Sequence, residues 1–252
     1  MKPRVIAVIQ ARMSSTRLPG KVLQDLGGHP VLERMVERVK HAKTVTETVV
    51  ATTTDLLDMP IVELCQRLGI PVFRGSLPDV LDRYYQCALY YRADYVVRLT
   101  GDCPLIDADL IDQVVKALLD NPLDFTCNRL PPPFKRTYPI GLDVEACTFE
   151  ALENAWKNAT AKHDREHVMP YLYEVTGRFR IKQLQNDVDY GSLRWTLDTP
   201  EDLELLREVI KRLGGRNDFS WREVLTLFLQ DPELAKINGE VAHKSMFDVE
   251  QR

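Results

Sequence analysis

The 252-residue sequence predicts an α/β protein built on a doubly wound, mostly parallel sheet. Short, continuous apolar runs such as Val5–Ile9 suit strands that are buried on both faces, as strands of parallel sheets are. Segments with apolar residues at helical spacing alternate with these runs, and that alternation is typical of a sheet covered by helices. Ligands of such sheets bind at the carboxyl ends of the strands, near the point where the strand order reverses.

The first half of the chain gives four pairs of strand and helix. Its strand segments are short and rich in β-branched residues, and its helical segments carry apolar residues three or four positions apart. The helix that begins near Ile61 stops at Gly69, because glycine suits the left-handed position that ends many helices. In chain order we expect strands at 5–9, 48–52, 71–73 and 94–100, and helices at 31–39, 61–68, 80–91 and 110–118.

The pattern changes after residue 122. Three consecutive prolines at 131–133 exclude regular helix and sheet in that stretch. We therefore expect one main domain over 1–215 with an inserted subregion near 123–190, followed by a C-terminal helical extension over 216–252. In this half the pattern predicts strands at 141–147, 179–184 and 193–197, and helices at 149–156, 164–176, 203–213 and 221–229.

Charge and cysteine content exclude several classes of protein. Lysine and arginine number 33 against 37 aspartates and glutamates, so the net charge of −4 lacks the surplus of a general nucleic-acid binder. The five cysteines form no CxxC pair, which indicates reduced thiols rather than a disulfide framework. The apolar run at 5–9 is too short for a signal sequence or a membrane span. We expect a cytoplasmic protein with no nucleic-acid and no membrane partner.

A basic, hydroxyl-rich loop, QARMSSTRLPGK, follows the first strand over residues 10–21. It is not a Walker A loop, which would need glycine where this chain has Ser15. Arg12, Arg17 and Lys21 could anchor a triphosphate, since charge-assisted contacts to phosphate contribute about 1.5–3 kcal/mol each. An ordinary basic surface loop is the alternative.

Two aspartates stand where expected strands end. Asp102 follows the strand at 94–100 on a tight turn, and Asp198 follows the strand at 193–197. Mg²⁺ takes one or two carboxylates together with substrate phosphates, so the pair suits a magnesium site. The alternatives are a turn-forming role for Asp102 and a helix-capping role for Asp198.

Two other candidate sites are disfavoured. A zinc site of the HExxH type needs glutamate directly after the first histidine, whereas Asp164 follows His163, so the pair with His167 does not fit it. Cys103 lies beside Asp102 but has no visible base to activate it as a nucleophile.

Three motifs together resemble the cytidylyltransferases that make CMP-activated sugars, which include CMP-Kdo synthetases and acylneuraminate cytidylyltransferases. They are IQARMSSTRLPGK, LTGDCPLID and WTLDTPEDLELL. With GLDVE, DREHVMPYLY and SLRWTLDTPEDL, the chain is most similar to the spore-coat polysaccharide branch of that superfamily. The resemblance covers residues 4–213. The first motif is highly specific, and the other two are weaker on their own.

The resemblance implies a nucleotide-diphospho-sugar transferase sandwich that binds CTP, with Mg²⁺ as cofactor. In this family a sugar hydroxyl attacks the α-phosphorus of CTP and pyrophosphate leaves. The family's catalytic positions fall on Arg17, Lys21, Asp102 and Asp198, and the two aspartates match its magnesium ligands. Its nucleotide-binding positions fall on Ala11, Arg12, Arg17, Lys21, Thr52, Asp79 and Thr100, with Ala11 contacting cytosine through its backbone.

This chain departs from the CMP-Kdo synthetases in two places. Those enzymes carry an amide residue where this chain has Thr100, and its acceptor half matches them poorly. We expect Asp143, Glu145 and His167, which lie in that half, to contact the sugar acceptor. A solvated face with ion pairs is the alternative for the polar residues of the second half.

The expected partners are CTP and a sugar acceptor, an acidic sugar for surface polysaccharide biosynthesis. The resemblance also implies a homodimer that forms through the segment 123–147. Two alternatives stay open at this point. One is the same fold using another nucleoside triphosphate or acting as a glycosyltransferase, and the other is a non-catalytic nucleotide-binding protein.

Overall fold

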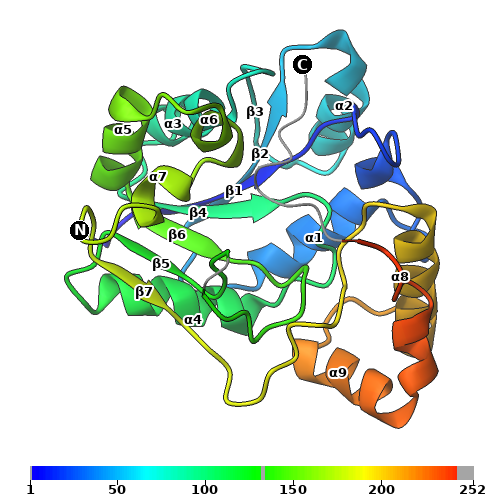
Figure 1. Cartoon of the computed structure of the whole chain (residues 1–252). Helices are drawn as coiled ribbons and strands as arrows, with labels where there is room; N and C mark the ends of the chain where they lie inside the picture. Colours follow the sequence, from blue (N-terminus) through cyan, green and yellow to red (C-terminus); the bar gives the residue numbers. More distant parts are fainter. Residues whose placement is uncertain (1, 132–133, 243–252) are drawn as a thin grey trace.

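A seven-stranded mixed sheet with the strand order β3-β2-β1-β4-β6-β5-β7 forms the centre of the molecule (Figure 1). The computed structural model describes residues 2–131 and 134–242. The strands are β1 Val5–Gln10, β2 Glu47–Thr53, β3 Val72–Gly75, β4 Tyr95–Thr100, β5 Phe125–Cys127, β6 Glu145–Thr148 and β7 Ile181–Gln183.

The strand order reverses between β1 and β4. From β1 the chain moves outward through β2 and β3, all parallel, and then returns to place β4 parallel to β1 on its other side. The register pairs Gln10 with Thr100, so the loops that leave these two strands start side by side. The doubly wound parallel half predicted from the sequence is confirmed, and its strand-order reversal is the place where such sheets bind ligands.

Each face of the sheet has its own apolar core. On β1, Val5, Ala7 and Ile9 belong to one core, and Ile6 and Val8 belong to the other, which explains why the whole run is apolar. Figure 1 shows α3, α5 and α7 over one face and α1 and α4 over the other. The helices are α1 Val31–Lys40, α2 Met59–Arg67, α3 Val80–Tyr90, α4 Ala108–Leu119, α5 Phe149–Asn158, α6 Lys162–His167, α7 Pro170–Tyr173, α8 Pro200–Arg212 and α9 Trp221–Gln230, with 3₁₀ turns η1 Lys21–Leu23, η2 Leu56–Asp58 and η3 Pro232–Lys236.

Three predicted elements of the second half were wrong or too long. Residues 193–197 form no strand, and a single bridge joins Arg194 to Ile140. Their apolar pattern arises because Trp195 and Leu197 are buried in the core, which requires no strand pairing. The expected strands at 141–147 and 179–184 shrink to β6 and β7.

The helix expected at 164–176 is broken into α6 and α7. Val168 has a positive φ of 72°, which a helix cannot accommodate and which ends α6, and Pro170 opens α7. β5 was not predicted, because its three residues are too few for a periodic pattern. β5 joins the sheet through β6 on one side and β7 on the other.

The later segments build onto the same sheet and core. β6 runs antiparallel to β4, so residues after 122 extend the sheet beyond the parallel half. Phe219, Trp221 and Val224 join the core that also contains residues of α1 and α4. The division into a domain over 1–215 and an extension over 216–252 stays a prediction. Within the described part of the chain, the helices are all too short or too polar to cross a membrane.

Gly141 should be intolerant of any side chain. Its φ is +104°, and an added Cβ would lie 2.6 Å from the carbonyl carbon of Trp195, in the segment that leads to Asp198. Gly141→Ala should therefore lower the free energy of unfolding by at least about 3 kcal/mol in urea titrations. Gly177 has a φ of +81° with nothing within 4 Å, so Gly177→Ala should cost only the backbone strain, about 1 kcal/mol. Equal losses in the two variants would contradict the close approach.

Candidate active site

The loop after β1 is held closed by its own backbone and by a buried acid. The carbonyl oxygen of Met13 accepts hydrogen bonds from the amides of Ser15 and Gly20, both at 2.9 Å. The amide of Met13 donates to Asp58 Oδ1 at 2.7 Å. Asp58 is 2% exposed and also accepts from the hydroxyl groups of Thr52 and Thr53. Asp58 therefore ties this loop to the end of β2.

A glycine allows the loop after β4 to approach the loop after β1. The amide of Gly101 donates to the carbonyl oxygen of Gln10 at 2.8 Å. A Cβ on Gly101 would lie 2.9 Å from that oxygen and 3.1 Å from the Cβ of Ala11. The close contact places Asp102, the next residue, beside the first loop.

Asp198 reaches the same place through the segment before α8. The amide of Leu197 donates to the carbonyl oxygen of Asp102 at 2.8 Å, which joins the two acid-bearing segments through their backbones. The N-cap of α8 is Thr199, whose hydroxyl accepts from the amide of Asp202 in a capping box. The capping role considered for Asp198 therefore belongs to its neighbour, and the Asp198 carboxylate points to cations instead.

The four predicted catalytic residues meet at one point. Lys21 Nζ lies 2.5 Å from Asp102 Oδ2 and 2.7 Å from Asp198 Oδ1. Arg17 Nη2 lies 2.8 Å from Asp198 Oδ2. The side chains of both aspartates are about one-fifth exposed, at 21% and 20%, so a ligand can reach them.

The opposite charges in this cluster keep each other ionised. Burial alone would raise the pKa of Asp198, but the positive charges of Lys21 and Arg17 hold that pKa well below its usual range. Burial would likewise lower the pKa of Lys21, but Asp102 and Asp198 raise it above its ordinary value. Asp198 and Lys21 therefore stay ionised at neutral pH.

The two carboxylates suit a divalent cation. A cationic ammonium group already lies between oxygens of Asp102 and Asp198, which come from different segments. Magnesium prefers such hard oxygen ligands and binds through one or two carboxylates plus substrate phosphates. The donor set therefore fits the Mg²⁺ that the resemblance implies, and Mg²⁺ binding stays a proposal.

Two further residues, which the sequence did not single out, contact this cluster. Arg194 Nη2 donates to Asp198 Oδ2 at 2.8 Å, and Arg194 also pairs with Asp202 through two hydrogen bonds of 2.9 and 3.0 Å. Asp202 is fully buried. A charged residue inside the apolar LRWTL and an acid at the third position of a proline-led helix were the available signals.

The remaining predicted nucleotide-binding residues lie near the carboxyl ends of the parallel strands. Ala11 is 4% exposed, and its amide donates to the carbonyl oxygen of Ala51. Thr52 is buried at the end of β2 and donates to Asp58. Thr100 ends β4, and its hydroxyl lies 3.3 Å from the sulfur of Cys103. Burial raises the pKa of the Cys103 thiol well above its usual value, which opposes a role as nucleophile.

Arg12 and Asp79 belong to different elements. Arg12 is half-buried in the first loop. Asp79 caps α3 by accepting from the amide of Asp82, and Arg165 Nε donates to both of its oxygens. Asp79 thus links α3 to α6, and the nucleotide contacts of both residues stay predictions.

The predicted acceptor residues fall into two groups. Glu145 is 3% exposed, pairs with Arg98 across 2.5 Å and lies opposite it in the sheet, next to the strand that ends at the site. Asp143 pairs with Arg136 through two contacts of 2.5 and 3.0 Å. His167 ends α6, a different element. The partly exposed Asp143–Arg136 pair fits the ion-paired alternative given above, whereas the buried Glu145–Arg98 pair is not a solvated face. Acceptor contact stays a prediction.

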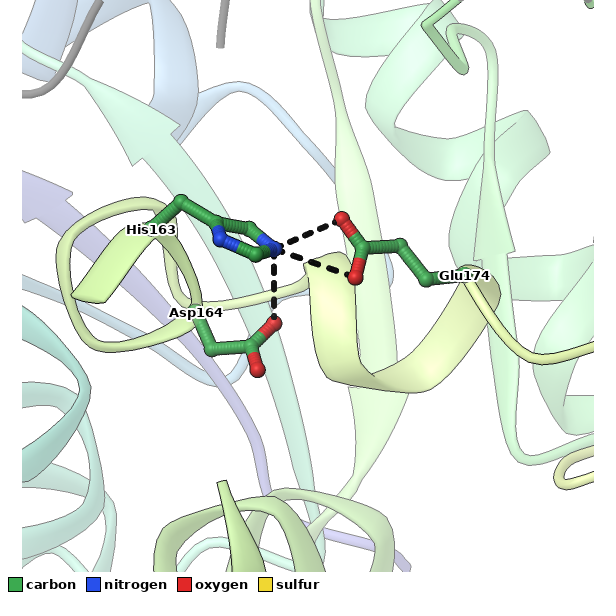
Figure 2. A group of neighbouring side chains, drawn as sticks. All are labelled: His163, Asp164 and Glu174. Carbon is green, nitrogen blue, oxygen red and sulfur yellow. Dashed lines mark hydrogen bonds and ion pairs between the residues drawn. The ribbon is translucent and has the colours of Figure 1, made fainter. Parts of the chain in front are cut away.

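A second polar cluster lies on α6 and α7. His163 Nε2 lies 2.8 and 3.1 Å from the two oxygens of Glu174 and 3.7 Å from Asp164 Oδ1 (Figure 2). Within residues 2–131 and 134–242, this is the one group of three or more histidine, cysteine, aspartate or glutamate residues whose ligand atoms all lie within 4.8 Å of one another. Its contacts tie α6 to α7 across Val168, as an ion-pair cluster would.

The chain is similar in sequence and in structure to known proteins. The sequence model of the cytidylyltransferase family matches residues 6–223. The chain is 32% identical over 249 residues to the spore coat polysaccharide biosynthesis protein SpsF of Bacillus subtilis, covering 92% of this chain and 96% of that protein. The structure of a cytidylyltransferase from Leptospira borgpetersenii is 35% identical, with a TM-score of 0.86 over 96% of this chain and 100% of that chain.

A more distant structure shares the fold. It is a CMP:2-keto-3-deoxy-manno-octonic acid synthetase complexed with CTP, 20% identical, with a TM-score of 0.65 over 83% of this chain and 99% of that chain. This chain belongs to the cytidylyltransferase family and is a nucleotidyltransferase. The resemblance found in the sequence is confirmed.

Asp102→Asn and Asp198→Asn should each reduce turnover at least about a hundredfold, or roughly 2.7 kcal/mol of transition-state stabilisation. Asparagine keeps the size of aspartate and its capacity to form turns, but it lacks the charge that a magnesium ligand supplies. Steady-state rates at saturating Mg²⁺ and nucleotide measure the loss, and melting curves confirm that each variant is folded.

Asp109→Asn is the matched control, because Asp109 is exposed in the first turn of α4 and should tolerate the change. The double variant should lose less than the sum of the two single losses, since both residues would hold one metal. Near-normal turnover in either single variant would remove that residue from the site.

Proposed function

We propose that this protein transfers the cytidylyl group of CTP to a hydroxyl group of a sugar, giving a CMP-sugar and pyrophosphate for surface polysaccharide biosynthesis. The convergence of Lys21 on Asp102 and Asp198 carries this proposal, because it joins three distant segments at the strand-order reversal. The likeness to SpsF supports the polysaccharide role, and the family supports CTP as donor.

The cluster has the charges that this reaction needs. The attacking hydroxyl approaches a polyanion, so the reaction depends on positioning and on neutralising phosphate charge. Mg²⁺ held by Asp102 and Asp198 would supply Lewis acidity at the phosphate oxygens. Lys21 and Arg17, both within 3 Å of these carboxylates, would bind the triphosphate and keep it in line for attack. Pyrophosphate would leave still paired with these cations.

The charge of the neighbouring region supports an acidic sugar as acceptor. Arg98 and Arg136 pair with Glu145 and Asp143 beside the end of β4. Arg129 adds a third cation: burial would lower its pKa, but Asp143 and Glu145 raise it above the usual value. Three arginines therefore face two carboxylates, and the carboxylate of an acidic sugar would balance the charge. A homodimer formed through 123–147 stays a prediction of the same proposal.

A panel of reactions tests the donor. The purified protein with Mg²⁺ should release pyrophosphate from CTP with an acidic sugar, and at least about tenfold more slowly from ATP, GTP or UTP. Asp102→Asn serves as the inactive control. Equal or faster turnover of ATP would contradict the cytidylyl assignment, and CTP binding without turnover of any sugar would favour a non-catalytic nucleotide-binding protein. Release of nucleoside diphosphate from a sugar nucleotide would favour a glycosyltransferase.

Arg129→Gln should weaken binding of the sugar acceptor without weakening binding of CTP. If Arg129 contacts an anionic acceptor, the KM for the best sugar of the panel should rise at least about tenfold, equivalent to 1.4 kcal/mol. The KM for CTP should change less than about twofold. Lys135→Gln, on the same connection with a side chain 66% exposed, is the control and should change neither value. An unchanged acceptor KM, or an equal rise for CTP, would refute this role.

A further inference from the structure

A buried asparagine lies in the C-terminal segment that follows α9. Asn238 is 4% exposed and lies two residues after the end of η3. Two anchors fix this segment: Leu234 is buried in the core, and Asp231, which caps η3, pairs with Arg212 of α8 across 2.9 Å. Asn238 therefore occupies a defined position against α8.

The Asn238 amide group spans the two partners of a buried ion pair. Its Nδ2 donates to Asp202 Oδ1 at 2.8 Å and to the backbone carbonyl oxygen of Arg194 at 3.1 Å. Asp202 Oδ2 also accepts from the amides of Asp198 and Thr199, at 2.9 and 3.1 Å. A fully buried carboxylate needs such a complete set of donors, since each one lost exposes an uncompensated charge.

The Arg194–Asp202 ion pair also contacts the candidate active site. Arg194 uses Nε and Nη2 for Asp202, and Nη2 also donates to Asp198 Oδ2 at 2.8 Å. Asn238 thus connects through Asp202 and Arg194 to a carboxylate that contacts Lys21. The segment reaches the site a second time, because Arg17 Nη1 makes a weak contact of 3.5 Å with the carbonyl oxygen of Ala242.

We propose that Asn238 is a positioning residue, which fixes the Asp202–Arg194 pair so that Arg194 holds the Asp198 carboxylate in its metal-binding orientation. The C-terminal segment is then a working part of the active site. The inference rests on the proposed function, in which Asp198 is a magnesium ligand. Residues that orient a metal ligand through hydrogen bonds contribute about 10–100-fold to metal affinity, so the effect is measurable.

Asn238→Leu tests the proposal, because leucine matches asparagine in length and removes both hydrogen bonds. Binding of Mn²⁺, followed by loss of the free-ion electron paramagnetic resonance signal in the presence of CTP, should weaken at least about tenfold. The Mg²⁺ concentration for half-maximal turnover should rise by the same factor, while kcat at saturating Mg²⁺ should change less than about threefold. Lys236→Ala is the matched control, since Lys236 lies on η3 with a side chain 72% exposed.

A merely structural asparagine would give a different result. Asn238→Leu would then lower the melting temperature and leave the Mn²⁺ affinity and the Mg²⁺ dependence of the folded protein unchanged, which would overturn the proposal. If Asn238→Leu does not fold, Asn238→Ala removes the same donors without crowding, and the same two measurements decide.

Asp198→Asn separates this inference from the proposed function. If Asp198→Asn keeps normal metal affinity and turnover, the proposed magnesium site itself fails. If Asp198→Asn loses both and the Asn238 variants lose neither, only the positioning role of Asn238 fails.

Discussion

Two aspartates held against one ammonium group set the requirements for the rest of this structure. Asp102 and Asp198 would repel each other if the Nζ of Lys21 did not lie within 2.7 Å of both. Their segments must also stay together although the two residues are far apart in the chain. The contact of Gly101 with Gln10 and the backbone hydrogen bond from Leu197 to Asp102 meet that need. The first of these contacts depends on the parallel strands β1 and β4, which end at the same edge of the sheet.

Burial explains why so many hydrogen bonds surround this cluster. A charge removed from water is costly unless partners replace its hydration, so each buried acid near the site is surrounded by donors. Asp58 accepts hydrogen bonds from the amide of Met13 and from threonine hydroxyl groups. Asp202 accepts hydrogen bonds from Arg194, from two backbone amides and from Asn238. These two acids stabilise the loop after β1 and the start of α8. The partly exposed carboxylates of Asp102 and Asp198 remain accessible to a ligand.

The second half of the chain contributes contacts to the cluster at the strand-order reversal. β6 brings Glu145 against Arg98 of β4, and the segment after α9 places Asn238 against Asp202. Parts of the chain from the first loop to residue 242 therefore contact one site. Such a site changes as a unit, since the loss of one partner leaves another buried charge uncompensated.

Local patterns in the sequence predicted the parallel half of the sheet and the four residues Arg17, Lys21, Asp102 and Asp198 that the fold brings together. Apolar runs buried on both faces and amphipathic helices are local patterns, and the loop over 10–21, Asp102 and Asp198 stand directly after such patterns. Long-range contacts explain why 193–197 is no strand, why a helix is broken at Val168 and how β5 joins the sheet. Asn238 has no local signature, and the local signals at Arg194 and Asp202 do not reveal which residues they contact, because the three residues come together only in the folded chain. Burial and hydrogen bonding between distant residues are properties of the folded chain, and no periodicity in the sequence encodes them.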